Sequence, residues 1–437
     1  MGDRDVISYT SVINAYSQKG GIESAKRAQA LLEEMRKRDL EPNAQTFNSV
    51  IMAWARSGGS KGSAKKAEGL LKRMEKMYDA GNMDLRPNAI LYTSVITAWS
   101  KSNEPGSASR AEMLLKQMWT LYKSGNKEIK PNTRTFTAVI DAWARSGEND
   151  AGERAEALMD RMIKFYGDGD NDVKPNVQTL TAAVDAYARN GGRDSASKAN
   201  SLVKKMESFG IKPNLQTNNV LISAWGNSQQ EGSGMMAESI LYKLEAAYHD
   251  GDADMKPTVI SYTSCINAWA KSLESGKAKK AQAILERLKR NHKFGSIDVE
   301  PNEITYTAVI NACATTYGPP EEKKEALKIA YKTFLEITES ETLKPNHVTY
   351  STFLRATSKL MPGGEKKDAI MSAAFRLCCK DGQVDDNCLF QLKNSASPEL
   401  VSDLLGGAEF SDITIDDLPS DWKRNVKFTP RKKTAMK

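Results

Sequence analysis

One pattern of hydrophobic and polar positions recurs along most of the chain. Its copies read VISYTSVINAY, AQTFNSVIMAW, AILYTSVITAW, TRTFTAVIDAW, VQTLTAAVDAY, LQTNNVLISAW, VISYTSCINAW and EITYTAVINAC. In the fourth copy Phe136, Val139, Ile140 and Trp143 follow the spacing i, i+3, i+4, i+7, which places them on one face of a helix. We predict that every copy is a helix with this face buried, and that Thr135, just before the aromatic residue, caps it.

A second helical pattern follows each copy after a Gly- and Ser-rich loop such as 57–63. In one unit this pattern places Ala67, Leu70, Leu71 and Met74 on one face, and the same spacing occurs at 155–162. Each unit is therefore predicted to be an antiparallel pair of helices. Because a lone pair cannot bury its apolar face, the pairs must stack and share one core. The predicted fold is all-α, a right-handed superhelical solenoid of two-helix repeats.

The unit boundaries are marked by a Pro-Asn pair, or once Pro-Thr, at intervals of 45, 44, 44, 38, 44, 44 and 44 residues. Eight units are expected, at 6–43, 44–88, 89–132, 133–176, 177–214, 215–258, 259–302 and 303–346, after a short stub at 1–5. A degenerate ninth unit or cap is expected at 347–390, followed by a C-terminal helix from Ser397-Pro398 and a basic tail within 391–437. The first copy begins at Val6, close to the chain start, which leaves open a longer protein with upstream repeats and a leader.

Composition narrows the class of protein. The 437 residues include 62 Lys+Arg and 55 Asp+Glu, so the net charge of +7 permits an anionic partner without requiring one. No stretch is apolar enough to span a membrane, and five scattered cysteines do not form a disulfide framework. We find no metal-ligand spacing, phosphate-binding loop or catalytic constellation. The sequence thus predicts a protein that is not an enzyme, with no metal, no cofactor, no membrane contact and no small-molecule substrate.

The repeated residues resemble pentatricopeptide repeats. The resemblance is carried by the Thr/Ser-aromatic phrase, a Lys or Arg two residues after the closing aromatic, an Ala-x-x-Leu-Leu-x-x-Met second helix and the final Lys-Pro-Asn, and it covers 6–346 with a ninth start at HVTYSTFL. Most units, at 44 residues, are longer than is usual in that family. The family binds single-stranded RNA, one base per repeat, mostly in mitochondria or plastids, where its members act in RNA processing, stability or translation. The resemblance implies the same partner, location and role here.

The resemblance assigns base reading to two places in every unit: the fifth residue and the last. These residues are Thr10/Asn43, Asn48/Asn88, Thr93/Asn132, Thr137/Asn176, Thr181/Asn214, Asn219/Thr258, Thr263/Asn302 and Thr307/Asn346. Thr with Asn resembles an adenine reader and Asn with Asn a pyrimidine reader, which implies the target 5′-A(C/U)AAA(C/U)AA-3′. The chemistry agrees, since hydroxyls and amides can match a base edge. Two structural explanations stay open: Thr tolerates close helix packing, and Asn after Pro is a common turn residue.

Two further places complete the implied site. The second residue of each unit would stack on a base: Ile7, Gln45, Ile90, Arg134, Gln178, Gln216, Ile260 and Ile304. Five cations near the end of the first helix would contact phosphates: Arg56, Lys101, Arg145, Arg189 and Lys271. A solvated helix end favoured by the helix dipole is the alternative for these cations. The aromatic series Tyr16, Trp54, Trp99, Trp143, Tyr187, Trp225 and Trp269 belongs to the apolar stripe and is predicted to be core.

A tetratricopeptide-like scaffold for other proteins is the competing hypothesis for this fold. Such scaffolds use varied charged and aromatic residues on the inner wall, whereas this chain repeats Thr and Asn. An enzyme would need an unrecognised activity in the C-terminal region. If the RNA-binding hypothesis is correct, we expect protein partners to bind the outer loops or the C-terminal region.

Overall fold

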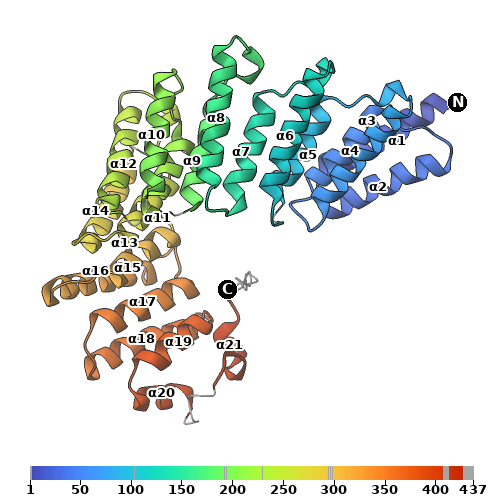
Figure 1. The fold of residues 1–437 in the computed structure, drawn as a ribbon. Helices are drawn as coiled ribbons and strands as arrows, with labels where there is room; N and C mark the ends of the chain where they lie inside the picture. The colour runs from blue at the N-terminus through green and yellow to red at the C-terminus, as the bar shows by residue number, and fades with distance from the viewer. Residues whose placement is uncertain are drawn as a thin grey trace. The chain divides into compact units, whose positions relative to one another are not determined.

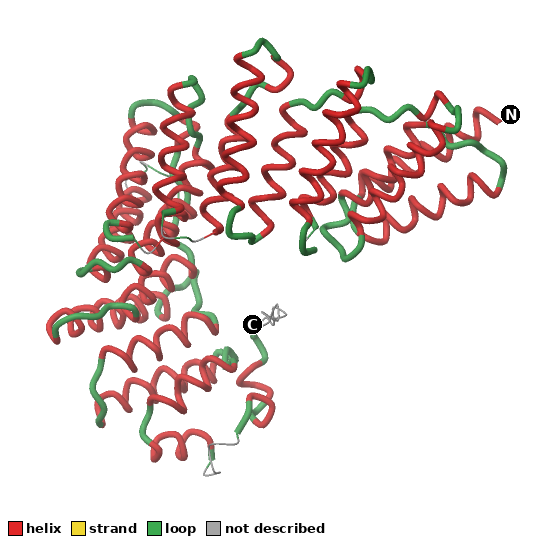
Figure 2. Tube along the Cα trace, in the orientation of Figure 1, coloured by secondary structure: helices red, strands yellow, loops and turns green. Residues whose placement is uncertain are grey.

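The computed structural model describes residues 2–102, 104–190, 192, 194–228, 230–293, 295, 297, 299–406 and 413–426. Throughout this part of the chain every regular element is a helix, and the chain folds as the predicted series of antiparallel helix pairs (Figure 1; Figure 2). Contacts divide it into two compact parts, Met1–Ala224 and Trp225–Lys437, called here the N-terminal block and the C-terminal block. The division falls inside α11.

The first helices of the units form one layer. In the N-terminal block the first helices of the first five units pack in sequence, each directly against the next, and in the C-terminal block those of the seventh, eighth and ninth units do the same. Apolar residues at helical spacing produce this layer, because each first helix presents one apolar face. The first helices are α1 (Gly2–Lys19), α3 (Ala44–Ala55), α5 (Ala89–Lys101), α7 (Thr133–Ser146), α9 (Val177–Asn190), α11 (Leu215–Ser228), α13 (Val259–Lys271), α15 (Glu303–Ala314) and α17 (His347–Leu360).

The second helices cover the opposite side of this layer. Those of the first four units, the seventh and the eighth each pack on the first helix of their own unit and on that of the next. The second helices are α2 (Ile22–Lys37), α4 (Ser63–Asp79), α6 (Ser107–Lys123), α8 (Ala151–Gly167), α10 (Ser195–Ser208), α12 (Ser233–His249), α14 (Lys277–Lys293), α16 (Pro320–Thr338) and α18 (Glu365–Lys380). Four of the longer units, of 44 or 45 residues, add a short 3₁₀ turn after this helix: η1 (Met83–Leu85), η2 (Lys127–Ile129), η3 (Asn171–Val173) and η4 (Ala253–Met255).

The start of each first helix is set by the residue that follows the boundary proline. In α7, Asn132 has extended backbone and its Oδ1 accepts a hydrogen bond from the backbone N–H of Thr135 at 3.1 Å, so Asn132 is the N-cap. Thr135 is therefore not the N-cap, because it already lies in the first turn, but it does take part in capping: its hydroxyl accepts a hydrogen bond from the backbone N–H of Asn132 at 3.4 Å, which completes a capping box. The helix begins at Thr133, two residues before Thr135 and three before the aromatic residue.

The predicted apolar stripe forms the core. Phe136, Val139 and Ile140 are fully buried and Trp143 is nearly so, and the other tryptophans of the series and Tyr187 are buried as well, while Tyr16 is half-buried. Three of the indole N–H groups, those of Trp99, Trp143 and Trp269, donate to a carboxylate of the preceding unit's second helix. Trp54 donates instead to the Gln29 amide, and Trp225 Nε1 has no hydrogen-bond partner among the described residues. Trp99 Nε1 donates to Glu68 at 3.0 Å and Trp143 Nε1 donates to Glu112 at 3.1 Å. These bonds tie neighbouring units together through the core, since a buried indole N–H needs a partner.

The chain continues the pattern beyond the eighth unit. Helices α17 and α18 form a ninth complete pair, and α19 (Asp386–Ser395) packs against α17, so the boundary expected at 390/391 falls inside α19. The predicted helix at Ser397-Pro398 is confirmed as α20 (Pro398–Leu405), with Ser397 as N-cap. The short elements η5 (Ile415–Asp417) and α21 (Ser420–Lys423) follow. The basic tail from 427 onward lies outside the described residues.

No helix in the described part of the chain combines the length and apolar character that a bilayer span requires.

Gly152 lies in a tight contact between two units, which predicts the effect of adding a side chain there. Gly152 is the second residue of α8, and a Cβ atom there would overlap the buried Tyr187 ring, whereas a Cβ at Gly167, the last residue of the same helix, would meet nothing within 4 Å. We expect Gly152→Ala to lower the free energy of unfolding by about 1 to 3 kcal/mol through overpacking. Gly167→Ala should leave it unchanged or raise it slightly, because Ala is the better helix former. Chemical denaturation of both variants checks this, and equal stabilities would contradict it.

Glu68 gives a pH-dependent prediction. Burial alone would raise its pKa, but hydrogen bonds from Arg110 and Lys72 outweigh burial and lower the pKa of Glu68 to about 2 from the 4.5 of a free Glu. Because the pKa is lower in the folded chain, the stabilisation is present above pH 4.5 and is lost as the pH falls from 4.5 through about 2. We expect Glu68→Gln to lower the free energy of unfolding at neutral pH. Between pH 4.5 and about 2, the unfolding free energy of the variant should change less with pH than that of the wild type.

The measurement is the unfolding free energy of wild type and Glu68→Gln at several pH values. Glu41→Gln serves as the control, because Glu41 is exposed and makes no hydrogen bond within the described residues. A variant curve parallel to that of the wild type would contradict the prediction.

Candidate nucleic-acid interface

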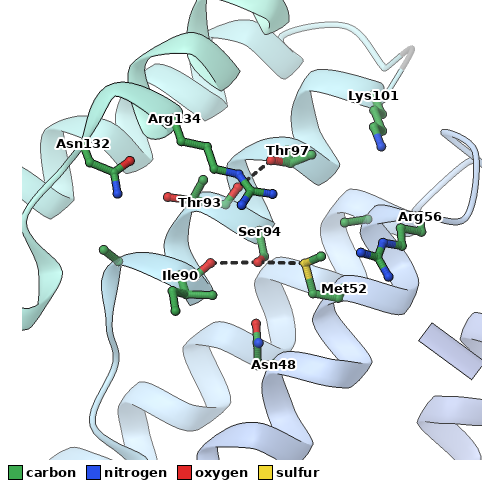
Figure 3. Close-up of a pocket in the computed structure, with 12 residues that line it drawn as sticks. Asn48, Met52, Arg56, Ile90, Thr93, Ser94, Thr97, Lys101, Asn132 and Arg134 are labelled. Carbon is green, nitrogen blue, oxygen red and sulfur yellow. Dashed lines mark hydrogen bonds between the residues drawn. The ribbon is translucent and has the colours of Figure 1, made fainter. Parts of the chain in front are cut away.

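A hollow of about 270 Å³ opens on the layer of first helices in the N-terminal block. Figure 3 shows its lining residues, with Arg134 projecting from α7 toward the residues of α5. All three predicted classes of site residue meet here. The predicted base readers are Asn48, Thr93 and Asn132, the stacking residues are Ile90 and Arg134, and the phosphate contacts are Arg56 and Lys101.

A second hollow of about 480 Å³ repeats this composition one unit further along. The residues predicted to read bases there are Thr137 and Asn176, and the cations are Lys101 and Arg145. Arg134 lines both hollows, so a single side chain lies between two adjacent sites. This is the position that a side chain stacking between successive bases would occupy.

Hydrogen bonds join the two predicted readers of a unit through a third residue. The hydroxyl of Thr137 lies 3.0 Å from that of Thr179, and the Thr179 hydroxyl donates to Asn176 Oδ1 at 2.9 Å. Thr179 is the third residue of the following unit and is fully buried. Six units contain the same arrangement, and we call their central residues the bridging threonines: Thr46, Thr135, Thr179, Thr217, Thr305 and Thr349.

The bridging threonines hold the predicted Thr readers close to the neighbouring helix. Thr10, Thr93, Thr181 and Thr263 expose only 6 to 7% of their surface, while Thr137 and Thr307 are half-buried. The closing asparagines are more open: Asn43 and Asn176 are exposed and Asn132, Asn214, Asn302 and Asn346 are half-buried. Within the described part of the chain no partner contacts the Nδ2 group of any of these six. The asparagine is therefore the more accessible half of each pair.

The second unit lacks this arrangement. Leu91 stands where the other units have a bridging threonine, and Asn88 Oδ1 accepts only the backbone N–H of Leu91, at 3.1 Å. Asn48, the other reader of this unit, has its Oδ1 buried without a hydrogen-bond partner in the described structure. In the sixth unit the predicted readers lie in different blocks, Asn219 in the N-terminal and Thr258 in the C-terminal block. There Ser261 contacts Thr258.

The predicted stacking residues are all exposed. Ile7, Ile90, Ile260 and Ile304 expose 61 to 64% of their surface, which is unusual for isoleucine on a folded protein. The other four, Gln45, Arg134, Gln178 and Gln216, are exposed as well. The second place of every unit therefore presents an exposed side chain, which is isoleucine in four units and polar or charged in the other four.

The five predicted phosphate contacts differ in their environment. Lys101 and Arg145 are exposed and make no hydrogen bond or ion pair within the described residues. Arg189 is paired with Asp185 at 2.6 Å. Arg56 donates to Gln18 Oε1 at 2.9 Å, and Lys271 donates to Asn227 Oδ1 at 2.7 Å, so these two bridge to the same place in the preceding unit.

One charged residue of the hollows was absent from the predicted set. Asp141 lines the second hollow one helical turn before Arg145, and burial raises the pKa of Asp141. Arg145, Arg189 and Lys101 oppose this effect, while Asp185 adds to it. A carboxylate at this place lowers the positive potential that the cations of the fourth unit offer to a phosphate.

The residues that sequence reasoning missed are chiefly the bridging threonines. A signal for them exists, since the third place of the unit is Thr in six of the units from the second to the ninth. The spacing could not show that their hydroxyls join two helices, because that contact depends on how far apart adjacent units lie. Among the described residues no group of three or more His, Cys, Asp or Glu is placed to hold a metal ion.

Fold and surface together define a helical-repeat solenoid with a periodic polar inner layer. The model of the PPR repeat family matches residues 4–56, and that of the pentatricopeptide repeat domain matches 169–228 and 251–316. A segment of 50 residues is 44% identical to a pentatricopeptide repeat-containing protein of Arabidopsis thaliana. These matches show that the chain contains pentatricopeptide repeats.

Solved structures share the fold. Two crystal structures of the pentatricopeptide repeat protein PPR10 in complex with an 18-nt psaJ RNA element, one of them a triple cysteine-to-serine variant, each superpose on 91% of this chain with a TM-score of 0.59 and 19% identity. The chain covers 50% of each of those structures, and the Arabidopsis match covers 11% of the chain and 7% of that relative.

Proposed function

We propose that this protein binds single-stranded RNA along its layer of first helices, one nucleotide per unit, with the target 5′-A(C/U)AAA(C/U)AA-3′. The observation that carries the proposal is the first hollow, where hydrogen-bonding, apolar and cationic side chains from adjacent units meet on one surface. A nucleotide needs these three kinds of contact, for its base edge, its base faces and its phosphate. One unit further along, hydrogen-bonding and cationic side chains recur, and Arg134 and Gln178 take the places of the apolar stacking residue.

The letters of the target rest on the reader pairs. Six units carry Thr with Asn and take adenine, and the second unit carries Asn48 with Asn88 and takes a pyrimidine. The sixth unit pairs Asn219 with Thr258 and is assigned a pyrimidine as well. The crystallised PPR10 complexes contain an RNA element, which supports an RNA ligand for this related fold. By binding such a segment, the protein would act in RNA processing, stability or translation in a mitochondrion or plastid.

The assignment is tested by RNA selection. Purified protein is incubated with a random single-stranded RNA pool, and the bound sequences are determined for wild type and for Thr137→Asn. We expect wild type to select the stated target and the variant to move the fourth letter from adenine toward a pyrimidine, since its unit then carries the residue pair of the second unit. An unchanged fourth letter would refute the assignment of letters, and absence of any bound RNA would refute RNA binding.

The phosphate contacts predict the salt dependence. If all five cations contact phosphates, the slope of log K against log salt for a single strand is about −3.5. We expect Arg145→Ala to make this slope less steep by about 0.7, because Arg145 makes no ion pair within the described residues. Arg189→Ala should change it less, because Arg189 is already neutralised by Asp185.

The measurement is the affinity for the selected RNA at increasing KCl concentration. The two variants are matched controls for each other, since they remove the same side chain from the same place in adjacent units. Equal losses of slope in both variants would show that the Asp185 ion pair does not limit phosphate contact.

A further inference from the structure

We propose that the bridging threonines are positioning residues that fix the hydrogen-bond polarity of the base readers, so that each unit containing one accepts an amino base and rejects a keto base. The inference rests on the proposed RNA-binding function and deepens it. A bridging threonine does not reach the base itself, because each one is fully buried between two first helices. It acts through the two readers that it joins.

The distances are alike in all six units. From the reader hydroxyl to the bridging hydroxyl they are 2.7, 2.8, 3.0, 2.6, 2.9 and 2.8 Å, in chain order. From the bridging hydroxyl to the closing Asn Oδ1 they are 2.9, 3.1, 2.9, 2.9, 3.0 and 3.2 Å. All but two of these contacts have the usual O–H···O length, and the contacts of Thr135 and Thr349 with their asparagines, at 3.1 and 3.2 Å, are slightly longer. These six units are also the six that are assigned adenine.

Counting hydrogens shows what each reader can still offer. In the fourth unit, the single hydrogen of the Thr179 hydroxyl goes to Asn176 Oδ1, because that oxygen can only accept. The Thr137 hydroxyl then donates to Thr179 or to the backbone oxygen of Thr133, and in both cases its hydrogen points away from the hollow. Asn176 Oδ1 already accepts two bonds. What remains for a ligand is an acceptor on Thr137 and a donor on Asn176 Nδ2.

A fixed acceptor beside a fixed donor selects between classes of base. Adenine and cytosine present an amino donor next to a ring nitrogen acceptor, whereas guanine and uracil present a carbonyl acceptor next to a ring N–H donor. In a fixed orientation, one polarity forms two hydrogen bonds and the other places donor against donor and acceptor against acceptor. Without the bridge, the amide of Asn176 would keep one bond, from the backbone N–H of Thr179, and the hydroxyl of Thr137 would keep one bond, to the Thr133 carbonyl. Each reader would then turn more easily, and the unit would adapt to either class.

The second unit is the internal comparison. Leu91 donates no side-chain hydrogen, and the amide of Asn48 keeps a buried Oδ1 without a partner. Among the described residues, no bond therefore fixes which end of the Asn48 amide faces the ligand. The second unit is accordingly one of the two that are assigned either pyrimidine. Helix α5 nevertheless starts in the usual way, since the Leu91 backbone N–H still donates a hydrogen bond to Asn88 Oδ1, the N-cap, at 3.1 Å. The bridging hydroxyl is thus not needed to begin a first helix.

The test uses the fourth letter and inosine, which has the polarity of guanine without its 2-amino group. We measure the affinity of wild type and Thr179→Val for the target RNA carrying adenine or inosine at the fourth letter. Wild type should prefer adenine, and in Thr179→Val this preference should fall by about tenfold, as expected for one discriminating hydrogen bond. Thr179→Ser, which keeps the hydroxyl, should retain the preference. Thr217→Val should lose it at the fifth letter only.

A second variant tests the inference in the opposite direction. Leu91→Thr supplies the missing hydroxyl, which can donate to Asn88 and accept from Asn48. The amide oxygen of Asn48 then faces the ligand as an acceptor. We expect the second letter to change from either pyrimidine to cytosine, with a preference over uracil of about tenfold.

The outcomes separate the two proposals. If Thr179→Val and Leu91→Thr keep the wild-type preferences while Thr137→Asn still shifts the fourth letter, the bridging role is wrong and the RNA-binding proposal stands. If wild type binds no RNA, both fail. A general loss of affinity at every letter in Thr179→Val, without recovery in Thr179→Ser and with no gain in Leu91→Thr, would show a purely structural role and overturn the inference.

Discussion

The hydrogen bond from the third backbone N–H of a first helix to the closing asparagine of the preceding unit is the interaction on which the rest of the structure depends. It starts the helix, and it also fixes the side chain that the unit offers to a ligand. Because one residue does both, the helix start and the proposed reading position cannot drift apart. A shift of one residue in the helix start would move the amide out of line with the corresponding amides of the other units.

Hydrogen bonds inside the core also keep the units in the same arrangement relative to their neighbours. Each buried tryptophan could pack in several ways against the preceding unit if only apolar contacts held it. The bonds from Trp99 to Glu68 and from Trp143 to Glu112 select one arrangement, because an unpaired indole N–H in the core is costly. In this way directional bonds set the spacing between units, and apolar burial supplies the stability.

The period of the apolar stripe was sufficient to predict the helix pairs. Of the predicted site residues, those of the second to fifth units are represented among the residues that line the two hollows. Thr135 was misassigned because a short polar residue before an aromatic resembles an N-cap, and only the backbone of Asn132 shows where the helix begins. The sequence also could not predict that Arg189 forms an ion pair with Asp185, whereas Arg145 forms none within the described residues. Both arginines follow an aspartate by four residues, so spacing alone treats them as equal.

Unit length varies without disturbing the layer of first helices, and the bridging contacts show why. The reader and bridging hydroxyls are 36 residues apart in the first and fifth units and 42 apart elsewhere, yet the contacts of the short units, 2.7 and 2.6 Å, match those of the long units. The extra residues include the 3₁₀ turns that follow the second helices, where Leu85, Ile129 and Val173 are buried as local anchors. Insertions there lengthen the unit on the side of the second helices. Within each block, a ligand along the first helices therefore meets the same contact between adjacent units, whatever the length of the unit.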